Sequence, residues 1–78
     1  MDFTEATDTL TKNVSLADLA RELKASYGLI RQARMASDSR SYRRPPEGWE
    51  RAVARLAEER ARELLTLKDE LESGPRPQ

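Results

Sequence analysis

The chain has neither cysteine nor histidine among its 78 residues. This excludes disulfides, thiolate or imidazole metal sites, and nucleophilic sites built on Cys–His or Ser–His pairs. Aromatic residues make up only 5%, and no apolar run approaches the roughly 18 residues of a membrane span. A core of this size contributes only about 3–5 kcal/mol, and of the usual means of reinforcing one, only a second subunit remains.

Charge is abundant but unevenly distributed. The 14 basic and 14 acidic residues cancel, yet residues 1–19 carry −3, residues 20–46 carry +5 and residues 47–78 carry −2. A basic block between acidic flanks suits a surface that faces phosphate, because the acids preserve solubility without weakening the local field. The alternative is a solvated, arginine-rich loop. The acidic N-terminus is unlike a signal peptide, so we expect a soluble, cytoplasmic protein that does not enter a membrane.

Apolar spacing of three and four residues predicts helices throughout, with no period-two pattern typical of strands. Asp2 and Glu5 form a helix-start signal for a first segment that reaches about Thr11. Residues 1–13 are therefore interpreted as a short helix or a frayed arm. A second helix is expected from Leu16 to Lys24, with Ser15 as its cap.

Ser26 can cap a third helix only a few residues later, which carries Leu29, Ile30 and Ala33. Two short helices that are capped separately across so short a turn form a helix-turn-helix pattern. Such pairs also occur in plain helical bundles, where the apolar residues are simply core. The third helix, however, presents Arg31, Gln32 and Arg34 outward without an acid.

The stretch from Leu16 to Met35, LADLARELKASYGLIRQARM, resembles the bipartite helix-turn-helix of the Cro/CI (Xre-type) repressors. The matching positions are the small residue where the helices cross, two core leucines, the turn alanine and serine, and the buried face of the recognition helix: Ala20, Leu19, Leu23, Ala25, Ser26, Ile30 and Ala33. Lys24 departs from the glycine that is usual in the turn. The later YRRPPEGW resembles, more loosely, small phage repressors of the anti-CRISPR-associated kind.

The resemblance implies that the third helix enters the major groove of double-stranded DNA. Arginine can donate two hydrogen bonds to guanine, and glutamine can pair with the edge of adenine. Gly28 would let the start of the helix come close to the duplex, and Leu29 could touch a thymine methyl. The predicted base-reading residues are Tyr27, Gly28, Leu29, Arg31 and Gln32. Serines at helix starts and exposed cations suit phosphate. The predicted phosphate contacts are Ser15, Ser26, Arg34, Arg40, Tyr42, Arg43 and Arg44.

The segment ASDSRSYRRPP is predicted to be a loop by its serines and prolines. Its arginines would position the recognition helix on phosphate without reading sequence. In the alternative, Tyr42 packs on the core and the arginines only solvate the loop. Pro45 and Pro46 are interpreted as a helix start, where a missing amide hydrogen does no harm.

From Pro46 to about Ser73 the sequence predicts one helix about 40 Å long, ended by Gly74. Its apolar stripe is longer than a core built from three short helices can cover. Leu64, Leu67 and Leu71 are therefore predicted to form a homodimer interface, by antiparallel or crossed packing. The alternative is a frayed surface helix held by pairs such as Glu58 with Arg62.

Together these patterns predict an all-α, compact helix-turn-helix bundle of about four helices with a long C-terminal helix. Residues 14–72 would hold the DNA-binding and dimerisation elements, and residues 73–78 a disordered tail. The expected function is that of a dimeric regulator, an autorepressor of a phage or mobile element, that binds a palindromic operator. The alternative is a protein-binding antiactivator or adaptor of the same body. No enzyme activity, metal or cofactor is expected.

Overall fold

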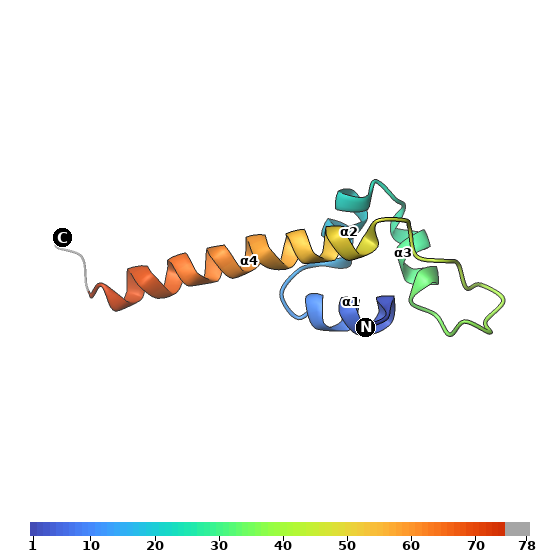
Figure 1. Ribbon diagram of the computed structural model, residues 1–78, viewed down its shortest axis with the longest axis horizontal. Helices are drawn as coiled ribbons and strands as arrows, with labels where there is room; N and C mark the ends of the chain where they lie inside the picture. Colours follow the sequence, from blue (N-terminus) through green and yellow to red (C-terminus); the bar gives the residue numbers. More distant parts are fainter. Residues whose placement is uncertain (75–78) are drawn as a thin grey trace.

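The computed structural model describes residues 1–74, which form four α-helices (Figure 1). They are α1 (Phe3–Leu10), α2 (Leu16–Leu23), α3 (Tyr27–Ala33) and α4 (Trp49–Glu72). This part of the chain contains no strand, so the expected all-α fold with a long C-terminal helix is confirmed. None of its helices is long and apolar enough to cross a membrane. The first three helices surround the start of α4, and the rest of α4 extends away from them (Figure 1).

Helix α1 is an integral part of the core. The Asp2 carboxylate accepts the Glu5 N–H at 2.8 Å, and the Glu5 carboxylate accepts the Asp2 N–H at 3.2 Å, which is a complete capping box. Phe3 and Leu10 are buried, as is Thr7, whose hydroxyl donates to the Phe3 carbonyl at 2.8 Å. The first segment is therefore a short helix with a buried face.

Helix α2 ends in a left-handed turn at Lys24, whose φ is 55°. The Ala25 N–H donates to the Ala20 carbonyl at 2.9 Å and the Lys24 N–H to the Arg21 carbonyl at 3.1 Å, the bonds of a Schellman motif. A non-glycine residue pays about 1–2 kcal/mol for this conformation. The helix ends at Leu23, one residue before the expected boundary, because the left-handed residue cannot continue it.

Helix α3 follows after this turn and packs its inner face on α2. The Ser26 hydroxyl accepts the Leu29 N–H at 3.0 Å and so caps the helix. Ile30 and Ala33 face inward and are buried, as are Leu19 and Ala20 on the facing helix. The two-helix arrangement expected from the capping serines is thus present.

The expected start of the long helix at Pro46 is wrong, because α4 begins three residues later, at Trp49. The Trp49 N–H donates to the Pro46 carbonyl at 3.2 Å, which closes a turn over Glu47 and Gly48. Gly48 has a φ of 82°, a left-handed conformation that interrupts any helix passing through it. Pro45 therefore lies in the connection from α3, and Pro46 begins this turn.

The end of α4 agrees with the sequence. The helix ends at Glu72, and Gly74 adopts a left-handed φ of 85° while its N–H donates to the Leu71 carbonyl at 3.3 Å. Ser73 caps the helix through its own backbone N–H, which donates to the Asp69 carbonyl at 3.0 Å. The rest of the tail predicted from Ser73, residues 75–78, lies outside the described residues.

The core lies where the first half of α4 meets the other helices. Trp49 packs edge-on against Phe3, with ring centroids 5.2 Å apart and an interplanar angle of 86°. Ala52 is buried, and Val53 and Leu56 are half-buried against the same cluster. This packing holds α2 against α4, and α3 packs in turn on α2, which sets the direction in which the outer face of α3 points.

Candidate nucleic-acid interface

The outer face of α3 is accessible over its whole length. Tyr27 is 50% exposed, Gly28 and Arg31 are exposed, and Leu29 and Gln32 are half-buried. No atom lies within 4 Å of the position that a Cβ would take on Gly28, so the helix start can approach a flat surface closely. Tyr27, Gly28, Arg31 and Gln32 therefore lie on one side of α3, whereas Leu29 lies at its edge, one turn before the buried Ala33.

The loop that follows α3 is tied back to it. The Arg43 N–H donates to the Gln32 carbonyl at 3.4 Å, and the Tyr42 N–H donates to the Ser39 carbonyl at 3.1 Å, which closes a turn at the loop tip. Tyr42 is half-buried and lines an open cleft of about 480 Å³ together with Phe3 and Trp49. The loop basic residues are thus carried beside the end of α3 by backbone bonds and one aromatic anchor.

The arginines at this end of the molecule are not neutralised by the protein itself. Within residues 1–74, the side chains of Arg31, Arg40 and Arg44 make no hydrogen bond or ion pair. Arg43 donates to the Tyr42 carbonyl at 2.9 Å and meets no carboxylate. All four are exposed. Exposed guanidinium groups without a carboxylate partner are the chemistry that phosphate and guanine both accept.

Arg34, predicted with these arginines, has a different position. Its guanidinium pairs with the Asp8 carboxylate on α1, and its side chain is only 26% exposed. Its carbonyl also accepts the Thr4 hydroxyl at 3.5 Å. Arg34 therefore links the end of α3 to α1, and its charge is already compensated, so we separate it from the free arginines. The sequence holds no local signal for this link, because Asp8 and Arg34 are 26 residues apart.

The two capping serines are exposed at the starts of α2 and α3. Ser15 accepts the Asp18 N–H at 3.1 Å, and Ser26 accepts the Leu29 N–H at 3.0 Å. In both, the hydroxyl oxygen acts as acceptor, which leaves the hydroxyl hydrogen available to donate to a phosphate oxygen. The caps and the predicted phosphate contacts are therefore compatible uses of the same side chains.

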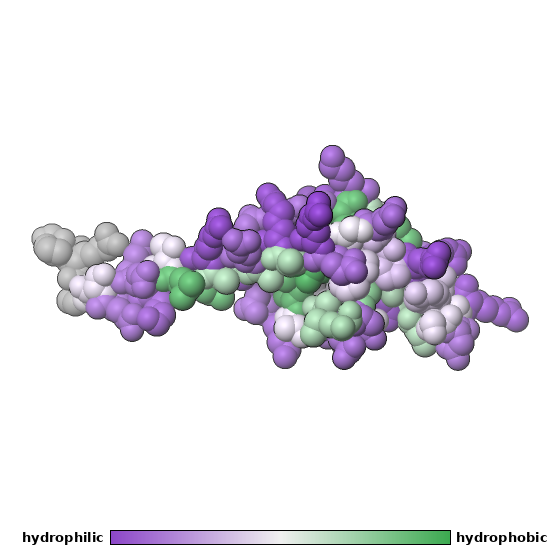
Figure 2. Space-filling view, viewed as in Figure 1, coloured by the Kyte–Doolittle hydropathy of each residue, from purple (hydrophilic) through white to green (hydrophobic). Residues whose placement is uncertain are grey.

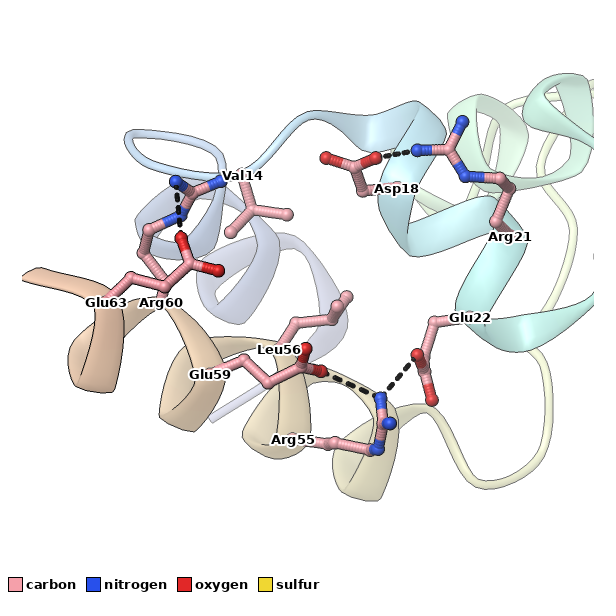
Figure 3. A pocket seen from close by; sticks show the side chains of 9 residues that line it. All are labelled: Val14, Asp18, Arg21, Glu22, Arg55, Leu56, Glu59, Arg60 and Glu63. Atoms are coloured by element: carbon pink, nitrogen blue, oxygen red, sulfur yellow. Dashed lines mark hydrogen bonds and ion pairs between the residues drawn. The ribbon is translucent and has the colours of Figure 1, made fainter.

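A cleft of about 370 Å³ between α2 and α4 shows the opposite electrostatic arrangement (Figure 3). Arg55 lies between Glu22 and Glu59 there, with nitrogen-to-oxygen distances of 2.9 and 2.8 Å. Arg60 pairs with Glu63 at 3.1 Å in the same cleft. Its cations are paired with acids, so this cleft has little net charge to attract a polyanion. Among residues 1–74, no group of three or more acids forms a candidate metal site.

The dimer residues predicted on α4 are accessible. Leu64, Leu67 and Leu71 are 48%, 51% and 71% exposed. Leu65, which the sequence interpretation did not single out, is 58% exposed and points from a different side of the helix.

No family model, curated protein or solved structure matches the chain. The resemblance to Cro/CI repressors therefore remains a prediction that depends on the residues of the two-helix unit alone. What the structure adds is the geometry around these residues: their caps, their turn and the exposed side of α3.

Proposed function

We propose that this protein is a sequence-specific, double-stranded DNA-binding regulator, a repressor of a phage or mobile element that acts in the bacterial cytoplasm and controls its own promoter. One observation carries the proposal: a capped two-helix unit presents Arg31 on its open face, beside a tethered loop with three further arginines that no carboxylate of residues 1–74 neutralises. α3 would enter the major groove, and the loop would contact phosphate. No catalytic role is assigned.

Base reading is assigned to Arg31 and Gln32. Arg31→Ala or Gln32→Ala should weaken binding to the specific site by about 1–3 kcal/mol and weaken binding to random DNA much less. The measurement is titration of a labelled fragment from upstream of the protein's own coding sequence, with and without excess competitor DNA. Arg62→Ala is the matched control, because it also removes one positive charge, but from a pair with Glu58 on α4. Equal weakening on both kinds of DNA would refute the base-reading role.

Phosphate contact is assigned to Arg43 and Arg44. Either residue changed to alanine should weaken binding to every sequence alike and reduce the slope of log affinity against log salt by roughly one. The same Arg62→Ala control should leave the slope unchanged. A slope that stays the same in the loop variants would mean that these arginines only solvate the loop.

A second candidate is a protein-binding antiactivator or adaptor built on the same body. It is favoured by the zero formal net charge of the chain and by the acidic segments on either side of the basic block. The titration separates the two candidates. Retention of the upstream fragment against competitor supports the regulator, and indifference to all DNA at low salt supports the adaptor.

A further inference from the structure

The second half of α4 carries an apolar strip, which we call the leucine face and define as Leu64, Leu67 and Leu71. Steps of three and four residues place these side chains on one side of the helix. Every residue from Ala61 to Ser73 is exposed, so the rest of the described chain leaves this strip uncovered. Hydrophobic residues reach the surface on the extended part of α4 in Figure 2, between hydrophilic ones.

The leucine face continues the side of α4 that α1 covers. α1 runs in the same direction as α4, since Phe3 meets Trp49 at one end and Leu10 approaches Leu64 at the other. At this second end a cleft of about 200 Å³ is lined by five apolar residues, Leu10, Val14, Ala57, Ala61 and Leu64, and by the polar Thr9, Asn13 and Arg60. α1 therefore stops where the leucine face begins, and an apolar cleft opens onto it.

We propose that the leucine face is covered by the same face of a second copy of this chain, with the two α4 helices antiparallel. In this arrangement Leu64 of one copy lies across from Leu67 of the other, and Leu71 of each lies across from Arg60 of its partner, in the cleft beside Ala57 and Ala61. The contact is self-complementary, as a two-fold interface requires. The proposal concerns assembly only, so it does not depend on DNA binding.

Excluded volume selects the antiparallel direction. In a parallel pair, the first half of the partner's α4 would continue along the side of α4 that α1 already occupies. In an antiparallel pair, the partner's α4 ends against the Leu10 end of α1, and its first half continues beyond Ser73 together with its own α1, α2 and α3. Of the two directions, only the antiparallel one covers both leucine faces while keeping the partner's α4 off the side of α4 that α1 occupies.

The charges beside the leucine face favour the parallel direction, but weakly. Glu63 and Glu70 flank one edge of the strip and Lys68 flanks the other. A parallel pair would set Glu63 against Lys68 of the partner, whereas an antiparallel pair sets Glu63 against Glu70. Exposed ion pairs contribute little, and two helices cannot share one volume, so the steric requirement decides. Within each chain Glu63 already pairs with Arg60 and Lys68 with Glu72, which reduces this charge preference further.

The first experiment tests whether this face holds the copies together. Sedimentation equilibrium should show that the unaltered protein is dimeric at tens of micromolar. Leu67→Glu should raise the dissociation constant at least tenfold. Leu65→Glu is the matched control, because it places the same charge on an equally exposed leucine outside the strip, and it should leave the dissociation constant within about twofold. Circular dichroism on each variant reports whether the helices remain folded; Leu67 lies beyond the body, so its replacement should preserve them.

The second experiment tests the relative direction of the two α4 helices. Because the chain has no native cysteine, any disulfide must form between the introduced cysteines. Leu71→Cys alone should not form a disulfide dimer, because the two sites lie about 16 Å apart along an antiparallel pair. A mixture of Leu71→Cys with Arg60→Cys should form a mixed disulfide on oxidation. A parallel pair gives the reverse pattern.

Three results would overturn the proposal. They are a monomer at tens of micromolar, equal weakening by Leu65→Glu and Leu67→Glu, and efficient self-linkage of Leu71→Cys. If the protein dimerises as described but binds no DNA, the proposed function is refuted and this proposal is not.

Discussion

The two halves of α4 each carry six charged residues but are stabilised in different ways. In the first half, Ala52 is buried and Trp49 packs edge-on against Phe3, so tertiary contacts hold the helix. In the second half every residue is exposed, and an ion pair such as that of Lys68 with Glu72 at 2.5 Å lies within one turn of the helix. A helical segment of this length is marginal on its own, so the second half depends on continuity with the first and on any partner that covers it.

A parallel contrast separates the cations of the chain. Of the five basic side chains on α4, all but Arg51 pair with a glutamate. Arg31, Arg40 and Arg44 have no such partner within residues 1–74. The same residue type thus serves helix stability in one region and remains available to an external anion in the other.

The largest expected difference concerns burial, between the helical bundle around the first half of α4 and the extension, which is the exposed second half of α4. Leu19 is fully buried between α2 and its neighbours, whereas Leu65 is 58% exposed. Leu19→Ala should lower the free energy of unfolding by about 2–5 kcal/mol, most of what a chain of this size has. Leu65→Ala should change it by less than about 0.5 kcal/mol. Urea denaturation followed by circular dichroism at one protein concentration checks both, and similar losses would show that the extension is part of the core.

A smaller effect is expected at the turn between α2 and α3. Lys24→Gly removes the cost of a left-handed lysine, about 1–2 kcal/mol, but adds unfolded-chain entropy worth about 0.4–1 kcal/mol. The net expectation is a gain in stability of about 0.5–1 kcal/mol. Gly28→Ala in α3 gives a comparison at a helical glycine, where the added Cβ would meet no atom within 4 Å and so would cause no clash. A loss of stability in Lys24→Gly would mean that the lysine side chain makes a stabilising contact.

The smallest expected effect distinguishes two ion pairs by double-mutant cycles. The Asp8–Arg34 pair joins two helices and is partly screened from solvent, so its coupling energy should be about 0.5–1 kcal/mol. The Glu58–Arg62 pair lies within one exposed helix and should give about 0.3–0.5 kcal/mol. Raising the salt concentration should reduce the second coupling more than the first. Couplings in the opposite order would contradict the assigned roles.

Much of the fold could be predicted because its signals are local. Ser15 and Ser26 cap the helices they were expected to cap, since the bonded N–H group lies only three residues away. The start of α4 was missed for an equally local reason. Proline is common at the first position of a helix, which favoured Pro46. Gly48, however, takes a left-handed conformation, and because glycine adopts positive and negative φ about equally, its presence in the sequence does not predict which one it takes.

The candidate site was predictable in its residue types but not in their pairing. Arg31 and Arg34 are three residues apart on the same short segment and look equivalent in sequence. In the structure Arg31 is exposed without a partner, while Arg34 pairs with Asp8 of α1. Likewise, the bond from Arg43 to the Gln32 carbonyl, which docks the loop on α3, has no sequence signature.

The amino-acid sequence by itself determined the helical class, the capped turn between α2 and α3, and the apolar strip of α4, because apolar spacing and helix caps act over a few residues. Only the tertiary structure decided which arginines remain free and where α1 stops along α4. These depend on contacts between residues far apart in the chain, such as Asp8 with Arg34 and Phe3 with Trp49. Such contacts follow from the packing of whole helices, whose geometry no local pattern records.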